Sequence, residues 1–298
     1  MGVRRSLGLA TLLASALIGS AAICGAARAT PAPDVETVRV MFVGDSLTGS
    51  PGCWRAPVWR SVTDDGYDVE MVGINTENEC GDVRNSVGAQ WDPDNTGIGG
   101  ITTTRMWNKL ATDGVLEKYQ PEVIVMLLGT NDLLGGSDAD AILAQYDKLL
   151  QLYRDEAANM KLVVGTPPPI DSGVCGCDAE QAALTSALPG WAASASTDES
   201  PVTVADLSTG FDPATETEDG VHPNDAGNAQ FAAAWTPVIE AALDSAFDAG
   251  QSTASPSPPA PIQADADQPQ PANQWLLPGV VVLLLVTVGV AGVLSRRS

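Results

Sequence analysis

Residues 38–46 read Val-Arg-Val-Met-Phe-Val-Gly-Asp-Ser, and this stretch decides the fold class. Its apolar and β-branched run is typical of a strand that is buried on both faces of a parallel sheet. The Gly44-Asp45-Ser46 that follows would lie at the carboxyl end of that strand, the edge where open α/β sheets bind ligands. Gly-Asp-Ser is also ordinary turn chemistry, so the tripeptide alone does not establish a site.

Runs of the same kind alternate with helical patterns along the chain. We expect strands near residues 37–44, 67–74, 122–129, 161–166 and 202–206, and helices near 54–65, 102–119, 138–158, 180–194 and 224–246. This alternation predicts an α/β fold of three layers, in which a five-stranded parallel sheet has helices on both faces. The flavodoxin-like strand order 2-1-3-4-5 would bring Ser46 and Asn131 to adjacent strand ends.

The chain contains one histidine, His222, in the run Asp219-Gly220-Val221-His222-Pro223. It can therefore build only one Ser-His pair. Serine is a poor nucleophile at neutral pH unless an imidazole takes its proton, and a third group must hold the imidazole in the right tautomer. Asp219 is close enough in sequence to do this from the same loop. The alternative, a histidine that caps a helix or fills a gap, is set aside because other segments supply the matching groups.

Two further segments carry such groups. Residues 95–102 read Asn-Thr-Gly-Ile-Gly-Gly-Ile-Thr, and their glycines would let a backbone N–H approach a ligand closely, although the segment alone reads as a flexible loop. Gly129-Thr130-Asn131-Asp132 follows the apolar run 123–128 directly. An asparagine amide at that strand end can point toward an oxygen that becomes negatively charged during a reaction.

In this order and with these spacings, the four segments resemble the SGNH hydrolase superfamily, also called GDSL esterases. The resemblance implies a nucleophile at Ser46, whose own N–H is one oxyanion donor. Gly100 would supply a second N–H, and the Asn131 amide a third. His222 would be the general base and Asp219 its orienting partner. The implied chemistry uses neither a metal ion nor a cofactor.

The flanks of the nucleophile are similar to those of carbohydrate esterase family 3, whose members deacetylate xylan. Residues 44–55 read Gly-Asp-Ser-Leu-Thr-Gly-Ser-Pro-Gly-Cys-Trp-Arg, and Cys175-Gly176-Cys177 matches as well. The substrate implied is an O-acetyl group on a polysaccharide or a small ester. A lysophospholipase or broad acyl-ester hydrolase is an alternative, and an inactive carbohydrate-binding module with the same fold is another. Trp54 and Trp91 could each stack on a sugar or simply pack.

The first 29 residues have the pattern of an export signal. Residues 1–29 begin with basic Arg4 and Arg5, continue with an apolar run and close on Ala27-Arg28-Ala29, the pattern of a secretory signal peptide. The catalytic domain is expected over residues 36–248, the extent of the family resemblance. Export would place this domain outside the cell.

A proline-rich stalk and a membrane anchor are expected after the domain. Residues 249–274 are rich in Pro, Ser, Ala and Gln, which predicts a disordered stalk. Residues 275–295 are predicted to form a transmembrane helix, because their apolar stretch, residues 276–294, would span roughly 28 Å at a rise of about 1.5 Å per residue. The basic residues Arg296 and Arg297 predict that the tail, residues 296–298, is cytoplasmic. We therefore expect a single-pass protein of the cell membrane with its catalytic domain outside.

The charge of the chain limits its partners. The formal net charge is −22, and the five arginines of the two end segments leave residues 30–294 more acidic still. Such a domain repels phosphate backbones and anionic lipid surfaces. Nucleic acid is therefore excluded as a partner, whereas neutral glycans and acyl esters are compatible.

Four cysteines remain after removal of the signal peptide: Cys53, Cys80, Cys175 and Cys177. An even count in an exported chain indicates disulfides, for which three connectivities exist. A metal site is disfavoured because the spacing lacks the paired ligands of zinc sites. We expect Cys53 to pair with Cys80, closing a loop that contributes about 3–4 kcal/mol in the chain-entropy account. The remaining pair would be Cys175 with Cys177.

Overall fold

The computed structural model describes residues 37–77, 80, 87 and 90–253. The predicted signal peptide, transmembrane helix and cytoplasmic tail lie outside the described residues, as does most of the predicted stalk. Within the described ranges, no helix is long and apolar enough to cross a membrane.

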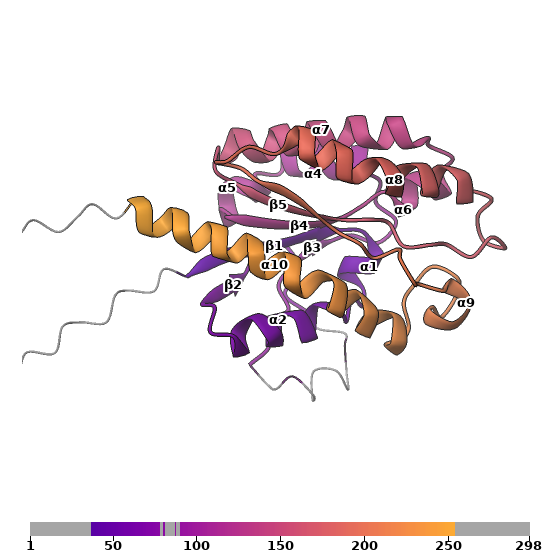
Figure 1. The fold of residues 1–298 in the computed structure, drawn as a ribbon, viewed down its shortest axis with the longest axis horizontal. Coiled ribbons are helices and arrows are strands. Elements are labelled where there is room, and N and C mark those ends of the chain that lie inside the picture. Colours follow the sequence, from indigo (N-terminus) through magenta and orange to yellow (C-terminus); the bar gives the residue numbers. More distant parts are fainter. Residues whose placement is uncertain (1–36, 78–79, 81–86, 88–89, 254–298) are drawn as a thin grey trace, which may run out of the picture. The chain divides into compact units, whose positions relative to one another are not determined.

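A parallel sheet forms the centre of the domain, as predicted (Figure 1). Its strands are β1 (Val38–Gly44), β2 (Val69–Met71), β3 (Thr96–Gly97), β4 (Val123–Leu127), β5 (Lys161–Gly165) and β6 (Val202–Ala205). Their order β2-β1-β4-β5-β6 is the predicted flavodoxin-like order. The predicted number of five strands was wrong by one, because β3 also pairs with β1. Only two residues long and glycine-rich, β3 has no alternating pattern by which a sequence could reveal it.

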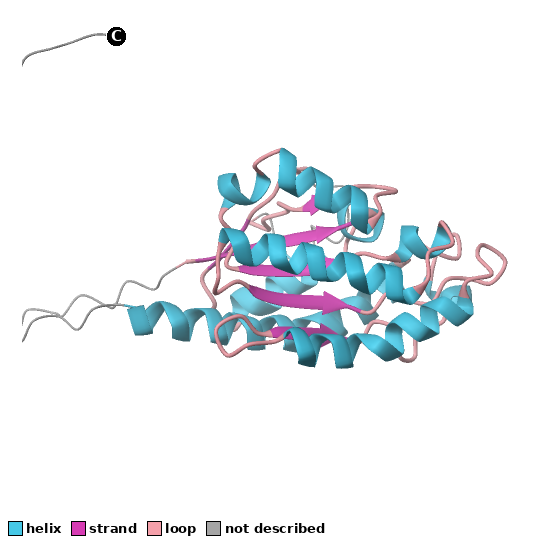
Figure 2. Cartoon of the chain, turned by 90° about the horizontal axis from the view of Figure 1, so that it is seen from above, coloured by secondary structure: helices cyan, strands magenta, loops and turns pink. Residues whose placement is uncertain are grey.

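Helices cover both faces of the sheet (Figure 2). They are α1 (Ser46–Gly49), α2 (Arg55–Asp64), α4 (Thr103–Thr112), α5 (Val115–Tyr119), α6 (Thr130–Leu134), α7 (Ala139–Glu156), α8 (Asp178–Ala195), α9 (Pro213–Glu216) and α10 (Asp225–Thr253). The helix predicted over residues 102–119 is broken into α4 and α5. Between them Gly114 has a φ of 62°, a left-handed conformation that ends a helix and favours glycine.

Alternate residues of the strands supply two apolar cores. Met41 and Val43 of β1 belong to the core beneath α4 and α7, whereas Val40 and Phe42 belong to the core beneath α2 and α10. β4 is buried throughout, as a central parallel strand should be. These cores cover the two faces of the sheet, and the loops at the carboxyl ends of the strands carry the polar residues described next.

The last helix extends further than predicted. α10 continues to Thr253, so residues 249–253 of the predicted stalk are helical. Phe247 lies beyond the predicted helix end at residue 246, and its ring packs against that of Tyr67, with 5.9 Å between centroids. The sequence offers no proline after residue 237 until Pro256, so nothing in the backbone ends the helix earlier.

Candidate active site

The segments singled out in the sequence meet at the carboxyl edge of the sheet. Ser46 is the first residue of α1, directly after β1, and Asn131 lies in α6, shortly after β4. β1 and β4 are neighbours, with Gly44 paired to Leu127, so their chain ends lie side by side. His222 is carried by the loop between α9 and α10.

Ser46, His222 and Asp219 form a chain of hydrogen bonds. His222 Nε2 lies 2.9 Å from Ser46 Oγ, and His222 Nδ1 lies 2.8 Å from Asp219 Oδ2. Because an ionised carboxylate only accepts, the ring proton belongs on Nδ1, and Nε2 is free to accept the hydroxyl proton of Ser46. The sequence prediction that these three residues come together agrees with this geometry.

The carboxylate of Asp219 is held in its charged form. Burial raises the pKa of Asp219, but hydrogen bonds from the backbone and ring of His222 and from the backbone of Val221 outweigh it, so the pKa lies below its ordinary value. The backbone N–H groups of His222 and Val221 donate to Oδ1 at 2.8 and 3.1 Å. One oxygen of Asp219 is therefore fixed by its own turn, and the other faces the imidazole.

This turn is itself fastened to the rest of the domain. Gly220 has a φ of 87°, and a Cβ placed there would collide with the side chains of Asp171 and Val174. The N–H of Asp171 donates to the Gly220 carbonyl at 2.8 Å, and the N–H of Glu218 donates to the His222 carbonyl at 2.8 Å. Only glycine fits at this position, which explains the glycine between the acid and the base.

The amide of Asn131 has a defined orientation. Its Nδ2 donates to Asp45 Oδ2 at 3.0 Å, while Asp45 Oδ1 accepts the N–H of Leu47 at 2.9 Å and caps α1. Burial raises the pKa of Asp45 to about 7. No role for Asp45 was predicted from the sequence, because its partner Asn131 is 86 residues away.

Gly100, the expected second donor, lies between β3 and α4. Its φ is 70°, a conformation for which glycine is suited, and it is exposed. The segment is anchored on both sides. The N–H of Ile98 donates to the Gly44 carbonyl at 3.0 Å. Thr103 donates to the buried carboxylate of Asp132 through its N–H at 2.9 Å and its hydroxyl at 2.6 Å. Sequence reasoning also missed Asp132, which links the start of α4 to α6.

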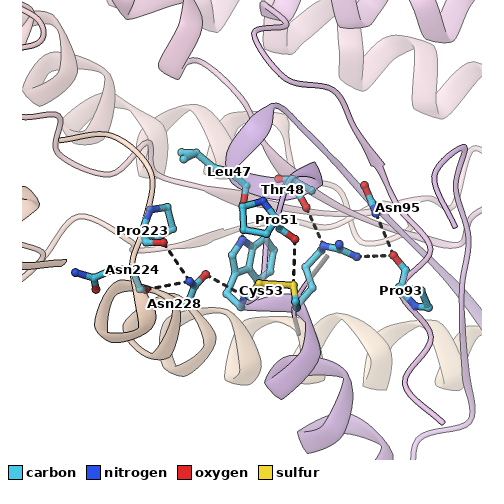
Figure 3. The surroundings of a disulfide bond; sticks show 12 residues. Leu47, Thr48, Pro51, Cys53, Pro93, Asn95, Pro223, Asn224 and Asn228 are labelled. Carbon is cyan, nitrogen blue, oxygen red and sulfur yellow. Dashed lines mark hydrogen bonds between the residues drawn. A yellow bond between two sulfur atoms is a disulfide. The ribbon is translucent and has the colours of Figure 1, made fainter. Parts of the chain in front are cut away.

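Both expected disulfides are present, Cys53 with Cys80 and Cys175 with Cys177. Figure 3 shows the surroundings of Cys53, next to the turn that follows Ser46. The guanidinium of Arg55, which is almost fully buried, donates to the Thr48 carbonyl at 2.8 Å and to the Pro93 carbonyl at 2.6 Å. Burial lowers the pKa of Arg55 to about 10, so it stays charged at neutral pH. The buried guanidinium of Arg55 thus joins the loop around Pro93 to the turn that follows Ser46.

The two tryptophans considered for sugar stacking are packing residues. Trp54 is 1% exposed, and its indole stacks on Trp235 and donates to the Leu47 carbonyl at 2.7 Å. Trp91 is also buried, within the small core around Cys53 and Cys80. Neither ring has a free face for a sugar. No group of three or more His, Cys, Asp or Glu residues in the described part of the chain is arranged to hold a metal ion.

Solved structures of other proteins are similar to this chain in sequence and fold. A carbohydrate esterase family 3 protein from Talaromyces cellulolyticus is 31% identical, with a TM-score of 0.62 over 70% of this chain and 98% of that one. An acetyl esterase mutant with an acetate ion is 30% identical, with a TM-score of 0.62 over the same shares of the two chains.

A multidomain esterase of Ruminococcus flavefaciens is 28% identical over an alignment of 283 residues, which covers 89% of this chain and 36% of that protein. The chain thus spans about a third of that relative's length. Residues 42–230 match the family of GDSL-like lipases and acylhydrolases. Since that match covers more than half of the sequence and includes all of the segments that meet at the sheet edge, the chain belongs to the GDSL-like lipase/acylhydrolase family.

Proposed function

We propose that this protein is a serine esterase that removes O-acetyl groups from a polysaccharide. The observation that carries the proposal is the chain of hydrogen bonds from Ser46 through His222 to Asp219. The likeness to an acetyl esterase and to a carbohydrate esterase family 3 protein supports an acetyl ester as the bond that is cleaved.

The reaction would take two steps. Ser46 Oγ attacks the ester carbonyl while His222 Nε2 takes its proton, and the negative charge gathers on the former carbonyl oxygen. The amide of Asn131 and the N–H groups of Ser46 and Gly100 would donate to that oxygen. His222 then returns the proton to the departing sugar oxygen, which leaves an acetyl group on Ser46. Water, deprotonated by His222, releases acetate and restores the serine.

The surface beside the nucleophile turn favours a hydrophilic substrate. A hollow of about 350 Å³ is lined by Gly49 and Ser50 at the end of α1, by residues 74–77 and by Gly97 of β3. Apart from Ile74, its lining residues are polar or glycine, and Thr76 and Glu77 suit hydroxyl groups better than an acyl chain. This observation favours an acetylated sugar over the lipid of a lysophospholipase.

Substrate series of two kinds test the proposal. Acetate release from acetylated xylan, acetylated chitin and acetylated peptidoglycan would show which polymer is used. Hydrolysis of p-nitrophenyl esters should fall steeply as the acyl chain lengthens beyond acetyl. Rates that rise with chain length would instead establish the lysophospholipase alternative, and no hydrolysis of any ester would establish the inactive binding module.

Replacing Glu77 by glutamine should affect the sugar and not the ester. We expect KM for acetylated xylo-oligosaccharides to rise about 3- to 10-fold, because a neutral amide oxygen accepts a weaker hydrogen bond than a carboxylate, with p-nitrophenyl acetate kinetics unchanged. The exposed Glu117 of α5 provides a matched control, because Glu117→Gln removes the same charge at the other edge of the sheet. Equal KM values for both variants would remove this hollow from the substrate site.

We also propose that the enzyme is exported and tethered to the cell membrane. The support is the signal-like sequence of residues 1–29 and the apolar sequence of residues 275–295. Residues 30–253, which end with α10, should be soluble and active when expressed alone, whereas the full chain should fractionate with membranes. Protease added to intact cells should release the activity. A full-length protein found in the culture medium would contradict the tether and leave the esterase proposal intact.

A further inference from the structure

Asp45 is a buried carboxylate that the Ser-His-Asp chain does not use. It is fully buried, and burial is the main reason why its pKa is raised to about 7. Keeping a carboxylate away from water costs free energy unless its oxygens are hydrogen-bonded. Such a residue beside the nucleophile calls for a physical explanation beyond helix capping, because serine, asparagine or threonine would also cap α1.

The explanation lies in what a carboxylate cannot do. Both oxygens of an ionised Asp45 only accept hydrogen bonds. One takes the N–H of Leu47, so the other can meet the Asn131 amide only if that amide presents its NH₂ group. An amide nitrogen carries two hydrogens. One is bound to Asp45, and the second stays available for an oxygen at the sheet edge.

We propose that Asp45 is a positioning residue that fixes the Asn131 amide with its nitrogen toward the reacting ester. The inference rests on the proposed function, in which Asn131 stabilises the oxyanion. While Asp45 is ionised, the ester oxygen would then meet a donor and not the amide oxygen. The hydrogen bonds from Thr103 to Asp132 hold α6 on its other side, so the backbone that carries the Asn131 side chain is also fixed.

The substitution Asp45→Asn tests the inference with almost no change of volume. If the new amide oxygen caps Leu47, its NH₂ faces Asn131, which must turn its own oxygen toward it. The hydrogen meant for the oxyanion is then lost. We expect kcat for p-nitrophenyl acetate to fall about 10²-fold with KM nearly unchanged, the effect of losing one oxyanion donor.

A double-mutant cycle separates positioning from a general structural role. Asn131→Ala alone should lower kcat by about the same 10². Adding Asp45→Asn in that background should change kcat little, because no amide remains to be oriented. A further drop of about 10² in the double variant would overturn the inference, since Asp45 would then act through something other than Asn131.

Thermal stability gives a second readout that is independent of catalysis. Because the pKa of Asp45 is raised in the folded protein, the fold favours the protonated form, and the wild type loses this contribution as the pH rises from 3.8 to about 7. Asp45→Asn does not titrate. The Tm of the variant minus that of the wild type should therefore be larger at about pH 8 than at about pH 5. The charge of His222 lowers the pKa of Asp45 and that of Asp132 raises it. Together with burial, the charge of Asp45 in turn raises the pKa of Tyr146 of α7.

Ser200→Ala is the matched control for damage to a buried hydrogen bond. The Ser200 hydroxyl is buried and donates to the Met160 carbonyl at 2.6 Å, at the opposite edge of the sheet. This variant should lower Tm and leave kcat unchanged. If Asp45→Asn behaves like Ser200→Ala, with lower Tm and full kcat, Asp45 is structural only. Failure of the proposed function is distinguishable, because the wild type would then hydrolyse no ester, or Ser46→Ala would retain the wild-type rate.

Discussion

Ser46→Ala should remove nearly all esterase activity, with kcat lowered by about 10⁶-fold. His222→Ala should cost about as much, because a serine and its base act as a unit and losing either removes the attack. Hydrolysis of p-nitrophenyl acetate, measured on folded protein checked by circular dichroism, is the test. The chain contains no second histidine that could replace His222.

Both single variants and their combination should therefore have the same residual rate. That rate would reflect binding and the oxyanion donors, which remain in place. Near-normal turnover in His222→Ala would show that the mechanism proposed here is wrong. A labelled fluorophosphonate should modify the wild type on Ser46 and leave Ser46→Ala unlabelled.

Asp219→Asn should lower kcat by about 10³- to 10⁴-fold while KM stays near its wild-type value. The new amide could present its NH₂ to Nδ1 and favour the tautomer in which Nε2 carries the proton. Nε2 could then no longer accept from Ser46. The lower limit of 10³-fold is smaller than the loss expected for a buried acid, because the side chain of Asp219 is 56% accessible and water screens its charge.

Asp206→Asn supplies a comparison for Asp219→Asn. Asp206 also accepts backbone hydrogen bonds in its own turn, from Ser208 at 2.9 Å and Thr209 at 3.0 Å, but in the described part of the chain it makes no hydrogen bond with His222. This variant should keep its kcat. If the two substitutions had equal and small effects, Asp219 would be a residue of the turn and the Ser-His pair would act without it.

Local patterns were sufficient to predict five of the six strands, and together with the family resemblance they pointed to the Ser-His-Asp residues. β1 and β4 are buried on both faces, so their apolar runs were visible in the sequence. Asp219 and His222 belong to one turn, which makes their contact local, and the order of the strands brings Ser46 to them. The break at Gly114 was missed because a glycine inside a helical pattern is often tolerated.

Long-range contacts could not be predicted in the same way. Asp45 and Asn131 are 86 residues apart, and nothing in either segment reveals that a carboxylate will be buried against an amide. Arg55 reads as a surface residue of α2, yet backbone carbonyls from two other segments surround it. Such partners depend on which loops meet after folding, and periodicity carries no information about them.

Hydrogen bonds with several side chains hold the four-residue turn α1 in one conformation. Its carbonyls at Leu47 and Thr48 accept the side chains of Trp54 and Arg55, and its amide at Leu47 is bound to Asp45. The N–H groups of Leu47 and Gly49, both bound to Asp45, should exchange with deuterium about as slowly as those of the core strands. Ser46 would therefore meet every ester in one geometry, free or loaded. Discrimination among acylated alcohols is then left to the surrounding loops, which can vary without disturbing the nucleophile.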